Sequence, residues 1–274
     1  MTRPLILHVG VQKTGTTSMQ RFLRRSAPGL SDLIVVRTPE EGTPMRPLGR
    51  AAVACSLNDE KDRRAALVHA FGDVLDTVPD GPQTVILSHE NMAGAMPGNG
   101  GETRLYPALP MMLDLLMDEA SARDFQPQVV VCTRKMATWL PSVWAQAVRT
   151  DGYARTLDEF LAETAGLPGW GDLIRRLSAT LGGGRVTRLR MEDEPDADRP
   201  GRRLLDRAGV PSDRIDALPP LEGRGMERLT PNATEFLRRL NGLSLNPHAR
   251  DRVADLVARS QPLFTAPSPS EGTL

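Results

Sequence analysis

The pattern of apolar and polar positions near the start of the chain predicts a strand, a turn and a helix in direct succession. Residues 5–9 are apolar apart from His8, as in a strand that is buried within a parallel sheet. Residues 10–15 contain two glycines and predict a turn, and apolar side chains then recur at i, i+3 and i+4 over residues 19–23. This unit directs backbone N–H groups and the positive end of a helix dipole to one place, where a phosphate or sulfate can bind.

The rest of the chain repeats the alternation of short apolar runs with helical patterns. Further strands are predicted at residues 33–36, 84–87, 128–133 and 185–189. Helices are predicted around residues 67–78, 109–117, 142–148, 156–161, 173–181 and 204–205, with two closing helices that start at Thr230 and Asn246, each followed by a proline. Residues 38–47 are rich in Pro, Gly and Glu and predict a surface loop.

Strands that alternate with helices predict an α/β fold. We expect a mostly parallel five-stranded sheet with helices on both faces and extra helices at the C-terminus. A chain of 274 residues can form one such domain, which we expect to span residues 1–261, with residues 262–274 as a disordered tail. Lys13, Glu90 and Arg134 each follow a predicted strand, so the fold would bring them to the ligand-binding edge of the sheet.

Composition and charge exclude several classes of partner. The 34 basic residues balance the 34 acidic ones, which does not favour binding to nucleic acid or to a membrane surface. No stretch has the roughly 20 apolar residues of a membrane span, and the first residues do not have the pattern of a signal peptide. Cys55 and Cys132 do not make a disulfide framework. We therefore expect a cytoplasmic protein.

The loop after the first strand differs from a nucleoside-triphosphate P-loop at one decisive position. The Walker spacing can be placed on residues 10–17, but Thr16 occupies the position of the Walker lysine. The lysine of this loop is Lys13, three residues earlier, and it is one of only three lysines among the 34 basic residues of the chain. A chain that uses arginine almost everywhere has kept a lysine here, which suggests a need for a compact ammonium group.

Two motifs resemble those of sulfotransferases that use 3′-phosphoadenosine 5′-phosphosulfate (PAPS). The first is Lys13-Thr14-Gly15-Thr16-Thr17-Ser18 after an apolar strand, which resembles the family's 5′-phosphosulfate loop. The second is Arg134 at the end of a later strand with Ser142 eight residues further, which resembles the pair that holds the 3′-phosphate. The chain is identified as similar to bacterial-type members of this family, and the resemblance implies a P-loop-like fold.

The resemblance also implies roles for these residues. Lys13 would stabilise the charge that builds on the leaving phosphate oxygen, and no metal would be needed. The backbone N–H groups of residues 14–17 and the hydroxyls of Thr16, Thr17 and Ser18 would hold the 5′-phosphate, while Arg134 and Ser142 would clamp the 3′-phosphate. PAPS would be the co-substrate. A purely structural alternative is a tight turn whose Thr and Ser residues only cap a helix.

Two neighbouring residues could accept the proton of the incoming nucleophile. Glu90 resembles the glutamate that carbohydrate sulfotransferases of this family use as a base, and His89 has a side-chain type suited to base catalysis at neutral pH. The segment from Ser88 to Asn91 could instead only cap a helix. His8 lies inside the first strand and is more typical of a hydrogen-bonded core residue than of a ligand.

These observations predict a metal-independent sulfotransferase that moves a sulfuryl group from PAPS to a hydroxyl or amine of a carbohydrate or small-molecule acceptor. A P-loop small-molecule kinase and a catalytically silent nucleotide-binding protein are the alternatives. We expect residues 94–101, residues 150–155 and the C-terminal helices to select the acceptor, and no nucleic acid or membrane to be a partner.

Overall fold

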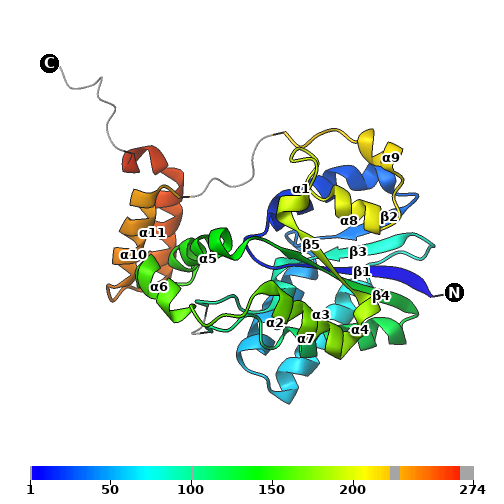
Figure 1. The fold of residues 1–274 in the computed structure, drawn as a ribbon, viewed down its shortest axis with the longest axis horizontal. Helices are drawn as coiled ribbons and strands as arrows, with labels where there is room; N and C mark the ends of the chain where they lie inside the picture. The colour runs from blue at the N-terminus through cyan, green and yellow to red at the C-terminus, as the bar shows by residue number, and fades with distance from the viewer. Residues whose placement is uncertain (1, 100–101, 223–228, 266–274) are drawn as a thin grey trace.

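The computed structural model describes residues 2–99, 102–222 and 229–265 of the chain. Its centre is a sheet of five parallel strands in the order β2–β3–β1–β4–β5 (Figure 1). The strands are β1 (Arg3–Gly10), β2 (Ile34–Arg37), β3 (Thr84–Ser88), β4 (Phe125–Thr133) and β5 (Val186–Arg190). The predicted α/β fold with five parallel strands is confirmed.

Helices cover both faces of the sheet because the apolar side chains of the strands alternate between them. Leu5, Leu7 and Val9 of β1 pack on one face, whereas Ile6 packs on the other. The first face is covered by α2 (Met45–Leu57), α3 (Lys61–Leu75), α4 (Leu109–Ala122) and α7 (Trp170–Leu181). The second face is covered by α1 (Thr16–Ser26), α8 (Arg202–Arg207) and α9 (Ser212–Asp216) (Figure 1).

The prediction of a loop over residues 38–47 is wrong for residues 45–47, because α2 begins at Met45. Pro44 precedes the helix and Pro47 lies in its first turn, where the N–H that proline lacks would have no partner within the helix. The Pro-rich composition therefore marks a helix start here and not the continuation of a loop.

Four further helices extend from the end of the sheet. They are α5 (Met136–Thr150), α6 (Leu157–Glu163), α10 (Pro231–Asn241) and α11 (Pro247–Arg259) (Figure 1). The predicted N-caps are confirmed: Thr230 accepts from the backbone of Ala233, and Asn246 accepts from that of His248. Gln261–Phe264 forms a short 3₁₀ turn, while residues 266–274 of the predicted tail lie outside the described part of the chain.

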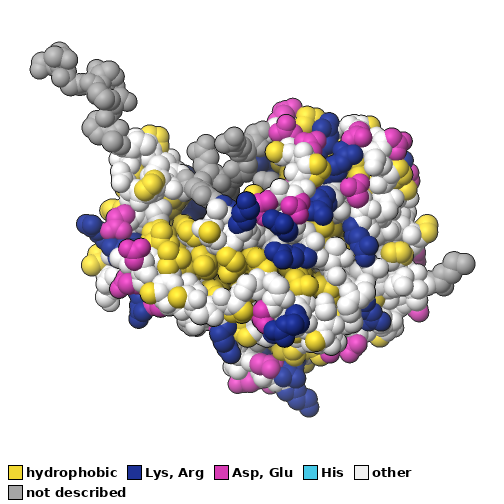
Figure 2. All heavy atoms as spheres, in the orientation of Figure 1, with side chains coloured by type: hydrophobic (Ala, Val, Ile, Leu, Met, Phe, Trp, Pro, Cys, Tyr) yellow, Lys and Arg dark blue, Asp and Glu magenta, His cyan; other side chains and the backbone are white. Residues whose placement is uncertain are grey.

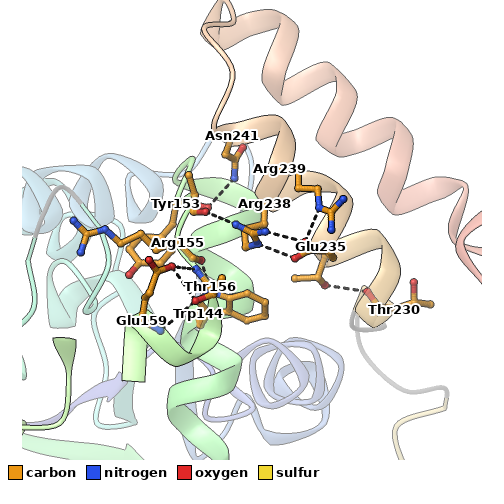
Figure 3. Close-up of polar contacts among 12 residues, drawn as sticks. Trp144, Tyr153, Arg155, Thr156, Glu159, Thr230, Glu235, Arg238, Arg239 and Asn241 are labelled. Atoms are coloured by element: carbon orange, nitrogen blue, oxygen red, sulfur yellow. Dashed lines mark hydrogen bonds and ion pairs between the residues drawn. The ribbon is translucent and has the colours of Figure 1, made fainter. Parts of the chain in front are cut away.

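The C-terminal helix pair contacts the end of α5 and the segment that follows it. Arg238 donates to the carbonyl of Ala154 at 2.9 Å, and Asn241 donates to the carbonyl of Tyr153 at 3.0 Å (Figure 3). A small apolar cluster that includes Val148 lies beneath these contacts. The helix pair therefore supports the C-terminal turn of α5.

Helix α5 has two different faces. Ser142 and Gln146 recur at i and i+4 on the face that lines the cavity described below. Leu140 and Trp144 lie on another face and are half-buried against the core. Figure 2 shows hydrophobic side chains gathered over the region of α5 and α6 on the side of the molecule in view.

Among the described helices, none has both the length and the apolar character needed to cross a membrane.

Candidate active site

A cavity of ≈ 910 Å³ lies at the carboxyl edge of the sheet. Lys13, Glu90, Arg134 and Ser142 all line it, although they come from three different loops and a helix. The parallel arrangement of β1, β3 and β4 explains this, because parallel strands present their carboxyl ends at one edge of a sheet. Size and position make this cavity the candidate active site.

The loop after β1 has the backbone shape of an anion cradle. Lys13 and Gly15 have positive φ angles of 69° and 85°, and α1 begins directly afterwards at Thr16. In the described part of the chain no side chain caps this helix, and its first turn carries no acidic residue. The first N–H groups of α1 and the positive end of its dipole therefore face the cavity, which favours an anion there. This arrangement does not fit the alternative in which Thr and Ser residues only cap a helix.

The hydroxyl groups of the loop and of the start of α1 have two roles: one stabilises the turn, and the others line the cavity. Thr14 is buried and donates to the carbonyl of Val11 at 2.7 Å, so its hydroxyl holds the turn together. Thr16, Thr17 and Ser18 line the cavity, and Thr16 also contacts the carbonyl of Gly10 at 3.3 Å. A Cβ atom at Gly10 would overlap the Thr16 side chain, so the close packing of helix on strand requires glycine there.

Two basic side chains lie close to each other here, Lys13 within this loop and Arg134 next to it. The ammonium of Lys13 lies 3.3 Å from Oε1 of Gln146 on α5. The guanidinium of Arg134 donates from Nε to the hydroxyl of Thr138 at 3.0 Å and from Nη1 to the carbonyl oxygen of Lys13 at 3.5 Å. Ser142 is 5% exposed and faces the same cavity from the second turn of α5. The structure thus brings together Lys13, Arg134 and Ser142.

Nδ1 of His89 lies 3.6 Å from a carboxylate oxygen of Glu90, but the two side chains have different surroundings. Glu90 lines the cavity, and its carboxylate accepts a hydrogen bond of 2.9 Å from the amide of Gln20. Burial opposes its ionisation, but the neighbouring His89 and the Gln20 amide outweigh that effect and lower the pKa of Glu90 to about 2. Its carboxylate is therefore ionised at neutral pH and can accept a proton.

His89 is 3% exposed and is not among the residues that line the cavity. Its Nδ1 accepts a hydrogen bond of 3.2 Å from the backbone N–H of Asn91, and its Nε2 side packs on α2, where a Cβ at Gly49 would overlap the ring. The imidazole therefore serves the turn and the packing of α2, and it lies beside the Glu90 carboxylate. Of the two candidate bases, the structure places only Glu90 in the cavity.

His8 is a core residue, as its position in the first strand predicts. It is fully buried, with Nδ1 2.7 Å from the hydroxyl of Ser88 and Nε2 3.1 Å from the sulfur of Cys132. Burial lowers the pKa of His8 to about 4, so the ring is neutral at physiological pH. Within the described residues, no group of three His, Cys, Asp or Glu side chains could hold a metal ion.

The cavity also has a wall that the sequence analysis missed. Four residues of α2 line it: Arg50, Val53, Ala54 and Leu57. Their spacing of i, i+3, i+4 and i+7 is the signal that could have revealed a helix face. Of the segments expected to select the acceptor, residues 94–101 contribute Met96 and Asn99 to the lining of the cavity, and residues 150–155 contribute Thr150 and Asp151. The C-terminal helices α10 and α11 do not line the cavity in the described part of the chain.

Comparison with known proteins gives a match in structure only. No protein-family model matches the sequence, and no curated protein is similar to it at a significant level. Among solved structures, the sulfotransferase from Alicyclobacillus acidocaldarius aligns with 96% of this chain and 99% of its own at 16% identity, with a TM-score of 0.50. The sulfotransferase domain from the curacin biosynthetic pathway aligns with 99% of this chain and 94% of its own at 13% identity, with a TM-score of 0.42. The first of these alignments shows that this chain has the P-loop-like α/β fold of a sulfotransferase.

Proposed function

We propose that this protein is a PAPS-dependent sulfotransferase. The observation that carries the proposal is the convergence of Lys13, Arg134 and Glu90 on one cavity beside the first turn of α1. The cations of Lys13 and Arg134, with a set of backbone N–H groups, suit a nucleotide with phosphates at two positions, and the Glu90 carboxylate suits an acceptor that must lose a proton. The sulfotransferase fold of the chain supports the same activity.

The proposed reaction is an in-line transfer. The oxygen or nitrogen of the acceptor forms a bond to sulfur, and the bond between sulfur and the bridging oxygen of the 5′-phosphate breaks. Glu90 takes the proton of the acceptor, and 3′-phosphoadenosine 5′-phosphate (PAP) leaves with the electron pair of the broken bond. Lys13 stabilises the charge on the leaving oxygen, while Arg134 and Ser142 hold the 3′-phosphate.

The acceptor site is proposed to lie between α2 and the C-terminal turn of α5. Val53, Ala54 and Leu57 form an apolar side, and Gln146 and Thr150 offer polar groups opposite. This mixture suits a carbohydrate or small molecule that presents a hydroxyl or an amine to Glu90.

We further propose that residues 1–261 act as one domain in the cytoplasm, where the free thiols of Cys55 and Cys132 would be stable.

A comparison of ligands by thermal shift tests the proposed function. At a hundred times its dissociation constant a ligand stabilises a protein by about 2.7 kcal/mol, which raises the melting temperature measurably. We expect stabilisation by PAP and none by ATP with Mg²⁺ at the same concentration. Stabilisation by ATP with Mg²⁺ alone would favour a P-loop kinase. Stabilisation by PAP without sulfuryl transfer to any of a panel of alcohols, sugars and amines would favour a silent nucleotide-binding protein.

A further inference from the structure

Two buried tryptophans each donate a hydrogen bond to the backbone of one of the two loops that carry Lys13 and Arg134. The indole N–H of Trp139 donates to the carbonyl of Gln12, the residue before Lys13, at 2.8 Å. The indole N–H of Trp170 donates to the carbonyl of Arg134 at 2.6 Å. Trp139 is 0% exposed and Trp170 is 4% exposed, so both indole donors are buried within the protein.

The two indole rings are in contact with each other. Trp139 belongs to α5 and Trp170 begins α7, and their ring centroids lie 4.7 Å apart at an interplanar angle of 68°. This edge-to-face geometry is favourable for aromatic pairs and fixes the relative orientation of the rings. The hydroxyl of Tyr106 adds a further contact to Oε1 of Gln12 at 2.7 Å, and its ring centroid lies 6.3 Å from that of Trp139.

A continuous chain of contacts therefore runs from one loop to the other: Gln12 carbonyl, Trp139, Trp170, Arg134 carbonyl. The two indoles belong to the hydrophobic core and are not among the residues that line the cavity. Both loops are irregular backbone, which would otherwise have freedom to move relative to each other. The side chains that anchor them are locked by packing in the core.

We propose that Trp139 and Trp170 are positioning residues that set the separation between the two phosphate sites of the donor. This inference rests on the proposed function. A nucleotide with a 5′-phosphosulfate and a 3′-phosphate has a fixed distance between its two anionic groups. The ammonium of Lys13 and the guanidinium of Arg134 must match that distance before the nucleotide arrives, and a mismatch of about 1 Å can reduce a rate roughly a hundredfold.

Tryptophan-to-phenylalanine variants test the role of the N–H groups, because phenylalanine keeps much of the ring packing and lacks the donor. Trp144→Phe is the matched control: Trp144 is on the same helix as Trp139, and its indole also donates to a backbone carbonyl, that of Arg155 at 3.0 Å (Figure 3). Trp144 is not among the residues that line the cavity. The measurements are the dissociation constants for PAP and for adenosine 5′-phosphosulfate, which lacks the 3′-phosphate.

We expect Trp170→Phe to weaken PAP binding about tenfold and to change adenosine 5′-phosphosulfate binding less than twofold, because it releases only the Arg134 loop. Trp139→Phe should weaken both ligands about fivefold, because both depend on the loop after β1. Trp144→Phe should change neither. In the double variant, the loss for PAP should be smaller than the product of the single losses, since both residues act through one ring contact.

Several outcomes would overturn the inference. Trp170→Phe could weaken both ligands equally, or lose no more PAP affinity than Trp144→Phe, and either result would reduce its role to packing. Losses that simply multiply in the double variant would show that the two residues act separately. If Trp170→Phe does not fold, as judged by its melting curve, Trp139→Phe tests the other loop, and a loss of affinity for the two ligands no greater than in Trp144→Phe would contradict the inference. A wild-type chain that binds neither nucleotide would instead contradict the proposed function.

Discussion

The guanidinium of Arg134 contacts the backbone of Lys13, with Nη1 of the arginine 3.5 Å from the carbonyl oxygen of the lysine. These residues are 121 positions apart in the chain. They meet because β1 and β4 are parallel neighbours, so the loops that follow them emerge side by side. The two proposed phosphate sites therefore belong to one cavity, on one edge of the sheet.

Removal of the Lys13 ammonium should impair the transfer step far more than the fold. We expect Lys13→Ala to lower kcat by about 10²–10³-fold, because the leaving oxygen loses its stabilising cation. Lys135→Ala is the control, since Lys135 is exposed and is not among the residues that line the cavity. Single-turnover kinetics with PAPS measure the effect, and wild-type turnover in Lys13→Ala would disprove the role.

Arg134 should discriminate between nucleotides with and without a 3′-phosphate. We expect Arg134→Ala to weaken PAP binding by about 1.5–3 kcal/mol, the usual contribution of a charged hydrogen bond, and to leave adenosine 5′-phosphosulfate nearly unaffected. Isothermal titration with both ligands measures this difference. Arg175→Ala, which changes an exposed arginine of α7, provides the control. Equal losses for the two ligands would contradict a 3′-phosphate clamp.

Glu90 should act as the base over a wide range of pH. Its pKa of about 2 lies far below neutrality, so the carboxylate is ionised above roughly pH 4 and should cause no acidic limb in the profile of kcat between pH 5 and 8. A histidine base would produce such a limb near its ordinary pKa. We expect Glu90→Gln to lower kcat by about 10²–10⁴-fold at every pH in this range.

His89→Ala distinguishes the two candidate bases in the same assay. Because its imidazole packs on α2 and is not among the cavity-lining residues, the variant should lose stability and keep most of its turnover at a temperature where it is folded. If turnover falls as far as in Glu90→Gln, His89 takes part in the proton transfer. If both variants retain normal turnover, the base lies elsewhere.

His8 should make the fold sensitive to mild acid. Its pKa is lowered from 6.5 to about 4, so between these values the unfolded chain binds a proton that the folded chain does not. Stability therefore falls as the pH drops from 6.5 to 4, and the contribution of His8 to this fall is about 3 kcal/mol, with no further change below pH 4. Urea unfolding at several pH values measures it.

The control for this stability effect is His8→Gln, whose side chain can hydrogen-bond and does not titrate. Its stability should decline less than that of the wild type between pH 6.5 and 4, although it starts lower because the buried contacts to Ser88 and Cys132 are altered. Parallel declines in the two proteins would show that other groups cause the loss. The lowered pKa of Glu90 affects stability in a more acidic range, between 4.5 and about 2.

The sequence by itself determined the local structure around the site. An apolar run, a glycine-bounded turn and a helical stripe specify β1, the cradle and α1, because each follows from the conformational preferences of neighbouring residues. The predicted strands fall within one to three residues of β2–β5, and the eight-residue spacing places Arg134 just before α5 and Ser142 in its second turn. Patterns of this kind need no information about distant parts of the chain.

Only the tertiary structure decided which side chains share the cavity. Glu90 and His89 are adjacent in sequence, yet Gly49 leaves space for the imidazole against α2 while Gln20 holds the carboxylate toward the cavity. The α2 wall, and the hydrogen bonds from Trp139 and Trp170 to the two loops, also depend on segments that are far apart along the chain. The physical reason is that packing and burial arise between elements, so their outcome is set only when the sheet has assembled.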